Sequence, residues 1–119
     1  MSVQKQLLLE LAASLSANDT DRVEAWFNRD FRLHEPGVPD WPVGHEGALL
    51  MLAKIRHNIP GVQVEALDMV EEGDRVAVRW LFSATQGGDT RQMSCVAIYR
   101  FTDGLISEDW GVATRATWP

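Results

Sequence analysis

Residues 97–112, AIYRFTDGLISEDWGV, decide the fold. They read as two β-strands joined at Asp103-Gly104, because this dipeptide supplies the positive φ angles that a tight hairpin turn requires. The second strand places Glu108, Asp109 and Trp110 side by side. Two adjacent carboxylates beside a large aromatic ring suit a reaction centre, and they suit a polar sheet edge equally well.

The rest of the chain has the patterns of three helices, one short strand and two further long strands, and the first strand of the hairpin begins at residue 93. Apolar residues at helical spacing predict helices over residues 2–17, 21–28 and 45–58, and alternation predicts a short strand over 31–35. Alternation also predicts strands over 62–70, 75–84 and 93–101, before the strand that follows Asp103-Gly104. Helices first and a long meander afterwards predict a single α+β domain over residues 1–119, with the helices on one face of a mostly antiparallel sheet.

Composition narrows the possible partners and the compartment. The formal net charge is −6, from 17 acidic and 11 basic residues, and no basic run exists. We therefore expect no nucleic-acid partner. The single cysteine, Cys95, excludes an internal disulfide and indicates a buried thiol in a reducing cytoplasm. No signal peptide and no apolar run of about 18 residues is present, so we expect a cytoplasmic protein without a membrane partner.

The order of elements and several motifs resemble the SnoaL-like polyketide cyclases, within the superfamily of nuclear-transport-factor-type proteins. The likeness covers nearly the whole chain and lies in four stretches: residues 31–37 (FRLHEPG), 44–47 (GHEG), 72–80 (EGDRVAVRW) and 99–110 (YRFTDGLISEDW). It implies a cone shape, in which three N-terminal helices pack on a strongly bent sheet around a mostly apolar pocket. It also implies a homodimer formed through the outer face of the sheet.

The last strand departs from the family pattern. Family enzymes often carry a catalytic aspartate at or just after the tryptophan, whereas residues 111–114 here contain no acid. Strand alternation puts residues 106, 108, 110 and 112 on one face and residues 107, 109, 111 and 113 on the other. Asp109 shares its face with small residues, where a ligand fits, so we assign it the role of general acid/base.

Two further residues are candidates for catalysis. His34 is a candidate helper of Asp109, because the pKa of an ordinary histidine lies near neutrality. Arg79 is a candidate partner of Asp109 or Glu108 across the sheet, which would keep that acid ionised. Two structural roles are also open: a hydrogen-bonded histidine at a strand end for His34, and a surface ion pair for Arg79. The expected pocket wall consists of Trp26, Trp41, Met51, Trp80, Tyr99, Trp110 and Glu108.

The motifs that hold cofactors are missing from the sequence. No glycine-rich phosphate loop or nucleophile elbow occurs, and the three histidines lack metal-ligand spacing, so we expect no cofactor and no metal. The leading hypothesis is cofactor-independent aldol cyclisation or isomerisation of a small hydrophobic carbonyl compound. Two alternatives stay open: a non-catalytic binding or dimerisation module of the same fold, and hydrolysis or dehydration of the epoxide hydrolase type through an Arg79–Asp109 pair.

Overall fold

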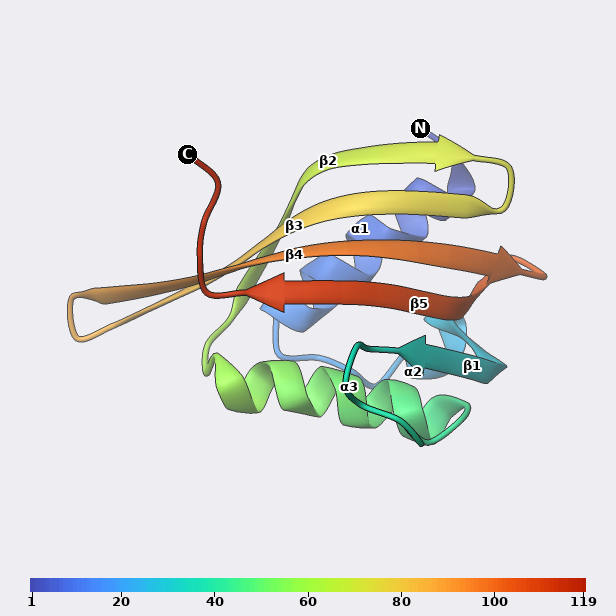
Figure 1. Cartoon of the computed structure of the whole chain (residues 1–119), viewed down its shortest axis with the longest axis horizontal. Helices are drawn as coiled ribbons and strands as arrows, with labels where there is room; N and C mark the ends of the chain where they lie inside the picture. The colour runs from blue at the N-terminus through green and yellow to red at the C-terminus, as the bar shows by residue number, and fades with distance from the viewer.

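The computed structural model describes residues 1–119 and contains three helices and five strands (Figure 1). In chain order the elements are α1 (Val3–Ser16), α2 (Val23–Trp26), β1 (Phe27–His34), α3 (His45–Asn58), β2 (Gln63–Glu72), β3 (Arg75–Gln86), β4 (Asp89–Thr102) and β5 (Leu105–Thr114). No helix is long and apolar enough to cross a membrane.

All five strands form one curled, open sheet in the order β1-β5-β4-β3-β2. Strands β2 to β5 pair antiparallel, and β1 pairs parallel to β5 at the edge. Helix α1 lies behind the sheet in Figure 1, and α3 runs along its open side, below β5. The α+β class and the mostly antiparallel sheet are therefore confirmed.

The hairpin between β4 and β5 has the turn that its sequence predicts. Asp103 has a φ of 55° and Gly104 a φ of 79°, so both residues lie in the left-handed region. This backbone conformation matches the right-handed twist of the two strands, and glycine adopts it without a steric penalty. The turn joins β4, the longest strand, directly to β5.

The helices differ from the predicted arrangement. The predicted helix over residues 21–28 is a single turn, because Phe27 already belongs to β1 and pairs with Ile106 of β5. The spacing of Val23, Trp26 and Phe27 fits a helix, but all three side chains are buried, and pairing with the sheet outweighs the local preference. Helix α3 follows β1, so the three helices do not form one N-terminal block.

The core lies between the helices and the inner face of the sheet. Strand β3 alternates strictly, with Val76, Val78, Trp80 and Phe82 buried on the inner face. Helix α1 contributes the buried leucines Leu8, Leu11 and Leu15 to the same cluster. The apolar face of α1 and the inner face of the sheet therefore form one hydrophobic core.

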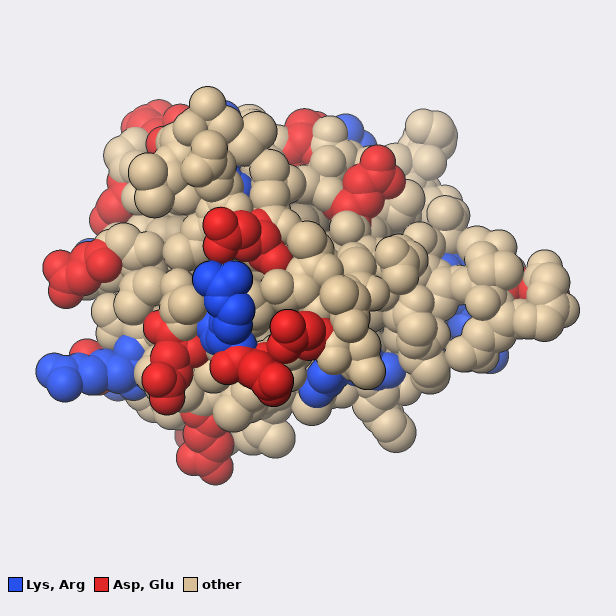
Figure 2. Space-filling model, turned by 180° about the vertical axis from the view of Figure 1, so that it is seen from behind, with Lys and Arg blue, Asp and Glu red and all other residues tan.

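The outer surface combines scattered charges with exposed apolar residues. On the side opposite that of Figure 1, acidic side chains surround the basic ones near the middle of the face (Figure 2). The outer face of the sheet exposes Val70, Val96, Ile98 and Val112, of which Val112 is 62% exposed. Nothing in the single chain covers these side chains fully, which bears on the expected homodimer.

Candidate functional site

A cavity of about 310 Å³ opens between the inner face of the sheet and helices α1 and α3. Sixteen of its 21 lining residues are hydrophobic. The others are Glu35, Lys54, Asn58, Asp109 and Gly111. A concave apolar site with a few converging polar groups is the usual form of a small-molecule site.

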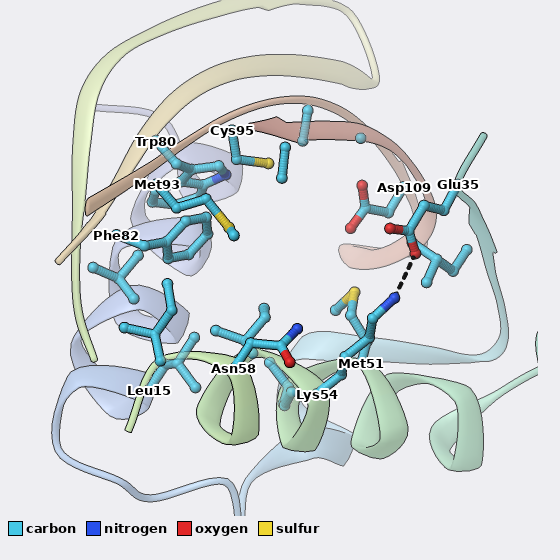
Figure 3. Close-up of a pocket in the computed structure, with 18 of the residues that line it drawn as sticks. Leu15, Glu35, Met51, Lys54, Asn58, Trp80, Phe82, Met93, Cys95 and Asp109 are labelled. Carbon is cyan, nitrogen blue, oxygen red and sulfur yellow. Dashed lines mark hydrogen bonds and ion pairs between the residues drawn. The ribbon is translucent and has the colours of Figure 1, made fainter. Parts of the chain in front are cut away.

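Asp109 is the buried acid of this cavity. It lies on β5, opposite Tyr99 of β4 and Leu33 of β1, and its side chain points into the cavity (Figure 3). The residue is only 5% exposed, and its Oδ1 atom has no hydrogen-bond partner in the chain. Burial, and to a smaller extent the charge of Glu35, raises the pKa of Asp109 from 3.8 to about 7.

Gly111 leaves open the space beside this carboxyl group. A Cβ atom at Gly111 would lie 3.3 Å from Oδ1 of Asp109. Glu35 follows directly after the His34–Trp110 pair of β1 and β5, so its side chain extends over this gap toward the cavity. Figure 3 shows Glu35 and Asp109 at the same end of the cavity.

A β-bulge at Ser107 determines which residues of β5 face the cavity. Arg100 pairs with Glu108, whereas the next residue of β4, Phe101, pairs with Ile106. The extra residue turns Ile106 into the core, on the same side as Asp109. The predicted face of Asp109 with Gly111 and Ala113 is therefore correct, but Ile106 does not share the face of Glu108.

His34 lies on the outer face of the sheet. Its Nε2 atom is 2.8 Å from Oε2 of Glu108, and the other oxygen of Glu108 accepts a hydrogen bond of 3.0 Å from Arg100. These contacts lower the pKa of Glu108, although partial burial opposes them. The His34 ring stacks on Trp110 at 5.1 Å, and Arg75 lies 5.4 Å from the Trp110 ring.

The structure therefore does not bring His34, Glu108 and Trp110 together with Asp109. The reason is the alternation of the strands, which sends neighbouring side chains to opposite faces. The expected pairing of Arg79 with Asp109 or Glu108 is also not formed. Arg79 contacts Asp68 of β2 at 2.9 Å and lies beneath the Trp118 ring, so an Arg79–Asp109 hydrolytic pair has no geometric basis.

Four of the expected wall residues line the cavity: Trp41, Met51, Trp80 and Tyr99. The indole N–H of Trp80 donates to the hydroxyl oxygen of Tyr99 at 2.8 Å, and burial raises the pKa of Tyr99. Trp26, the last residue of α2, is only 1% exposed and belongs to the core, and it does not line the cavity.

The polar residues Glu35 and Lys54 were missed as site residues, although the sequence contains a signal for both. Glu35 alternates with Phe31 and Leu33, which are the inward residues of β1. Lys54 lies one turn after Met51 on the cavity side of α3. The side chains are linked, because Nζ of Lys54 lies 3.3 Å from Oε2 of Glu35. No group of three or more potential metal ligands is present.

Comparison with known proteins identifies the family. The family model of the SnoaL-like domain matches residues 8–109. A SnoaL-like polyketide cyclase from Agrobacterium tumefaciens is similar in structure, with a TM-score of 0.76, 23% identity, and coverage of 96% of this chain and 93% of that one. No curated protein matches this chain significantly.

Two further solved structures share the fold. A proposed polyketide cyclase from Acidithiobacillus ferrooxidans has a TM-score of 0.83 and 20% identity, over 96% of this chain and 89% of that one. IdmH from Streptomyces antibioticus, also a proposed polyketide cyclase, has a TM-score of 0.74 and 21% identity, over 92% and 91% of the two chains. At such identities the likeness establishes the fold. Together with the family match over most of its length, this shows that the chain belongs to the SnoaL-like domain family.

Proposed function

We propose that this protein is a small-molecule enzyme that performs general acid/base chemistry on a hydrophobic carbonyl compound without a cofactor. The observation that carries the proposal is Asp109, a buried acid with an unpartnered oxygen in an apolar cavity. With a pKa of about 7, this carboxyl group holds comparable amounts of acid and base at neutral pH. This is the condition under which one group both removes and returns a proton efficiently.

The proposed step is proton transfer at the carbon next to the carbonyl group. The ionised carboxylate of Asp109 takes the proton, and the electron pair of the C–H bond forms the enolate. If the substrate has a C=C bond that becomes conjugated with the enolate, return of the proton to the far carbon of this dienolate moves the double bond and gives an isomer. Attack of the enolate carbon on a second carbonyl carbon closes a ring by aldol addition, and the proton of Asp109 then passes to the new alkoxide.

The shape of the cavity supports an apolar substrate with its reactive end at Asp109. Trp80, Phe82 and Met93 form a wall of large apolar side chains across the cavity from Asp109 (Figure 3). A flat hydrocarbon body suits this wall, and the carbonyl end then lies beside the carboxyl group. Because Asp109 is only 5% exposed, water screens the charge of its carboxylate poorly.

The test is hydrogen–deuterium exchange of a ketone in D₂O. The probe is 2-acetylnaphthalene, a flat apolar methyl ketone, and mass spectrometry follows deuterium uptake into its methyl group. We expect the wild-type protein to accelerate the uptake and Asp109→Asn to abolish this effect. His34→Gln, on the outer face, serves as the control and is expected to retain the acceleration. Equal acceleration by wild type and Asp109→Asn would refute the role of Asp109.

A binding or dimerisation module is the second candidate, supported by the exposed apolar side chains on the outer face. Val96, Ile98 and Val112 are 43%, 41% and 62% exposed on adjacent strands. Light scattering coupled to gel filtration measures the mass, and Ile98→Arg is expected to convert a dimer through this face into a monomer. A dimer with no exchange activity toward any ketone would favour this candidate over the enzyme.

A further inference from the structure

The cavity is polar at one end and apolar at the other. Glu35, Asp109 and Lys54 gather at one end, and Trp80, Phe82 and Met93 lie across from them (Figure 3). A ligand that fills the cavity with its apolar body against the aromatic wall therefore presents its other end to these charged groups. The polar groups at this end of the cavity therefore determine which chemical group of a ligand can bind there.

Lys54 is the single cationic side chain that lines the cavity. Its contact with Glu35, at 3.3 Å, is long for an ion-pair hydrogen bond, and no other side chain accepts from it. An ammonium group has three N–H donors, so two of them remain available. The Lys54 side chain is 45% exposed, which leaves its head group accessible from the mouth of the cavity.

The ammonium group is held in place by an aromatic ring. Nζ of Lys54 lies 5.6 Å from the centre of the Trp41 ring, within the range of a cation–π interaction. The Trp41 indole N–H donates to the carbonyl oxygen of Gly47 at 2.9 Å, which fixes the ring against the first turn of α3. This close approach needs glycine, since a Cβ atom at Gly47 would lie 1.9 Å from the carbonyl oxygen of Pro42.

Asn58 supplies a second polar group on the same side of α3. It lies four residues after Lys54, and Figure 3 shows its amide directed into the cavity. The amide group makes no hydrogen bond within the chain, so its two N–H donors are free for a ligand. Lys54 and Asn58 thus present cationic and neutral donors along one helix face.

We propose that Lys54 and Asn58 bind a carboxylate group of the ligand, so that the substrate class is an apolar carbonyl acid. This inference rests on the proposed function, because it takes the cavity as the substrate site. A carboxylate accepts hydrogen bonds from both donors, and these replace the long contact between Lys54 and Glu35. Protonated Asp109 does not repel the incoming anion. Ionised Glu35 does, and the ligand carboxylate must displace it from Lys54.

The test compares two ligands that differ in one negative charge. The probes are 4-(2-naphthyl)-4-oxobutanoate, which carries its ketone and carboxylate on the same side of the aromatic ring system, and its methyl ester, titrated into ¹⁵N-labelled protein. The indole N–H signals of Trp41 and Trp80 report the two ends of the cavity, and those of Trp110 and Trp118 report the surface outside it. Binding in the cavity is expected to shift the first two signals and leave the other two in place.

We expect the acid to bind about tenfold more tightly than the ester, the scale of one hydrogen bond to a charged group. Lys54→Met should abolish this preference, and Lys54→Arg should restore most of it. Lys5→Met removes the only other lysine, outside the cavity, and is expected to keep the wild-type preference. The unchanged Trp26 signal and the melting temperature show that each variant is folded.

Three results would overturn the inference. Equal affinities of the wild type for acid and ester would show that Lys54 does not bind the ligand carboxylate. A preference for the acid that survives in Lys54→Met would show the same. If ketone exchange by Asp109 persists in those cases, the proposed function stands and this inference alone fails. Shifts of neither Trp41 nor Trp80 with any ligand would refute the cavity as the ligand site, and the proposed function would fail with it.

Discussion

The burial of Asp109 makes a quantitative prediction for the stability of the protein at different pH values. Its pKa is about 7 in the folded chain and about 3.8 when unfolded. The folded state therefore binds the proton of Asp109 more tightly than the unfolded state does. This proton contributes its full stability to the fold below pH 3.8, and the contribution is lost as pH rises through 7. At about 1.36 kcal/mol for each unit, the full loss is about 4 kcal/mol.

Asp109→Asn removes the charge while it keeps the shape of the side chain. We expect the variant and the wild type to unfold at similar urea concentrations at pH 4.5. By pH 8.5 the variant should be more stable than the wild type, with the difference in unfolding free energy larger by about 3 kcal/mol than at pH 4.5. Other titrating groups are present in both proteins, so their contributions cancel in the difference.

The measurement is urea unfolding, followed by tryptophan fluorescence, at half-unit steps from pH 4.5 to 8.5. Glu65→Gln removes an exposed carboxyl group that has no ion-pair partner, and it gives the background effect of losing one surface charge. A stability difference between Asp109→Asn and wild type that stays constant over this range would refute the reasoning. The acid would then have no perturbed proton affinity, and its catalytic role would lose its physical basis.

Three further predictions concern the surroundings of this acid. Glu35→Gln should lower the pKa of Asp109, measured by ¹³C NMR of its carboxyl carbon, because it removes a nearby negative charge. The pKa should stay above 3.8, since burial is the larger cause of its shift. An unchanged pKa would show that the charge of Glu35 does not act on Asp109. Cys95 is partly buried in the cavity wall, and burial raises its pKa to about 12, so it should react with a disulfide reagent at pH 8 much more slowly in the folded than in the unfolded protein; equal rates would contradict the raised pKa. Gly47→Ala should lower the unfolding free energy by more than about 2 kcal/mol in urea titrations, because its Cβ meets the Pro42 carbonyl oxygen, and a neutral effect would count against this packing.

Much of the fold follows from local patterns in the sequence. The strict alternation of Val76, Val78, Trp80 and Phe82 predicts the buried face of β3, and Asp103-Gly104 predicts the tight turn before β5. These features depend on neighbouring residues alone. The end of α2 does not, because the pairing of Phe27 with a distant strand decides it.

The site was harder to predict from the sequence than the fold, because irregularities in the pairing of the strands position its residues. A β-bulge at Ser107 moves Ile106 into the core, and a second shift of register, at Leu67, sets Asp68 opposite Arg79. No sequence pattern marks either bulge. The inward face of Glu35, by contrast, follows from its alternation with Leu33.

The position of Glu35 links the two proposals through electrostatics. In the free protein Lys54 contacts Glu35, and the charge of Glu35 still raises the pKa of Asp109. A ligand carboxylate that takes Lys54 away adds a negative charge at this end of the cavity, and like charges favour the protonated form of a neighbouring acid. Binding of a carbonyl acid should therefore raise the pKa of Asp109, so that the ionised base that removes the proton from the substrate reaches its full amount only at a higher pH than in the free protein.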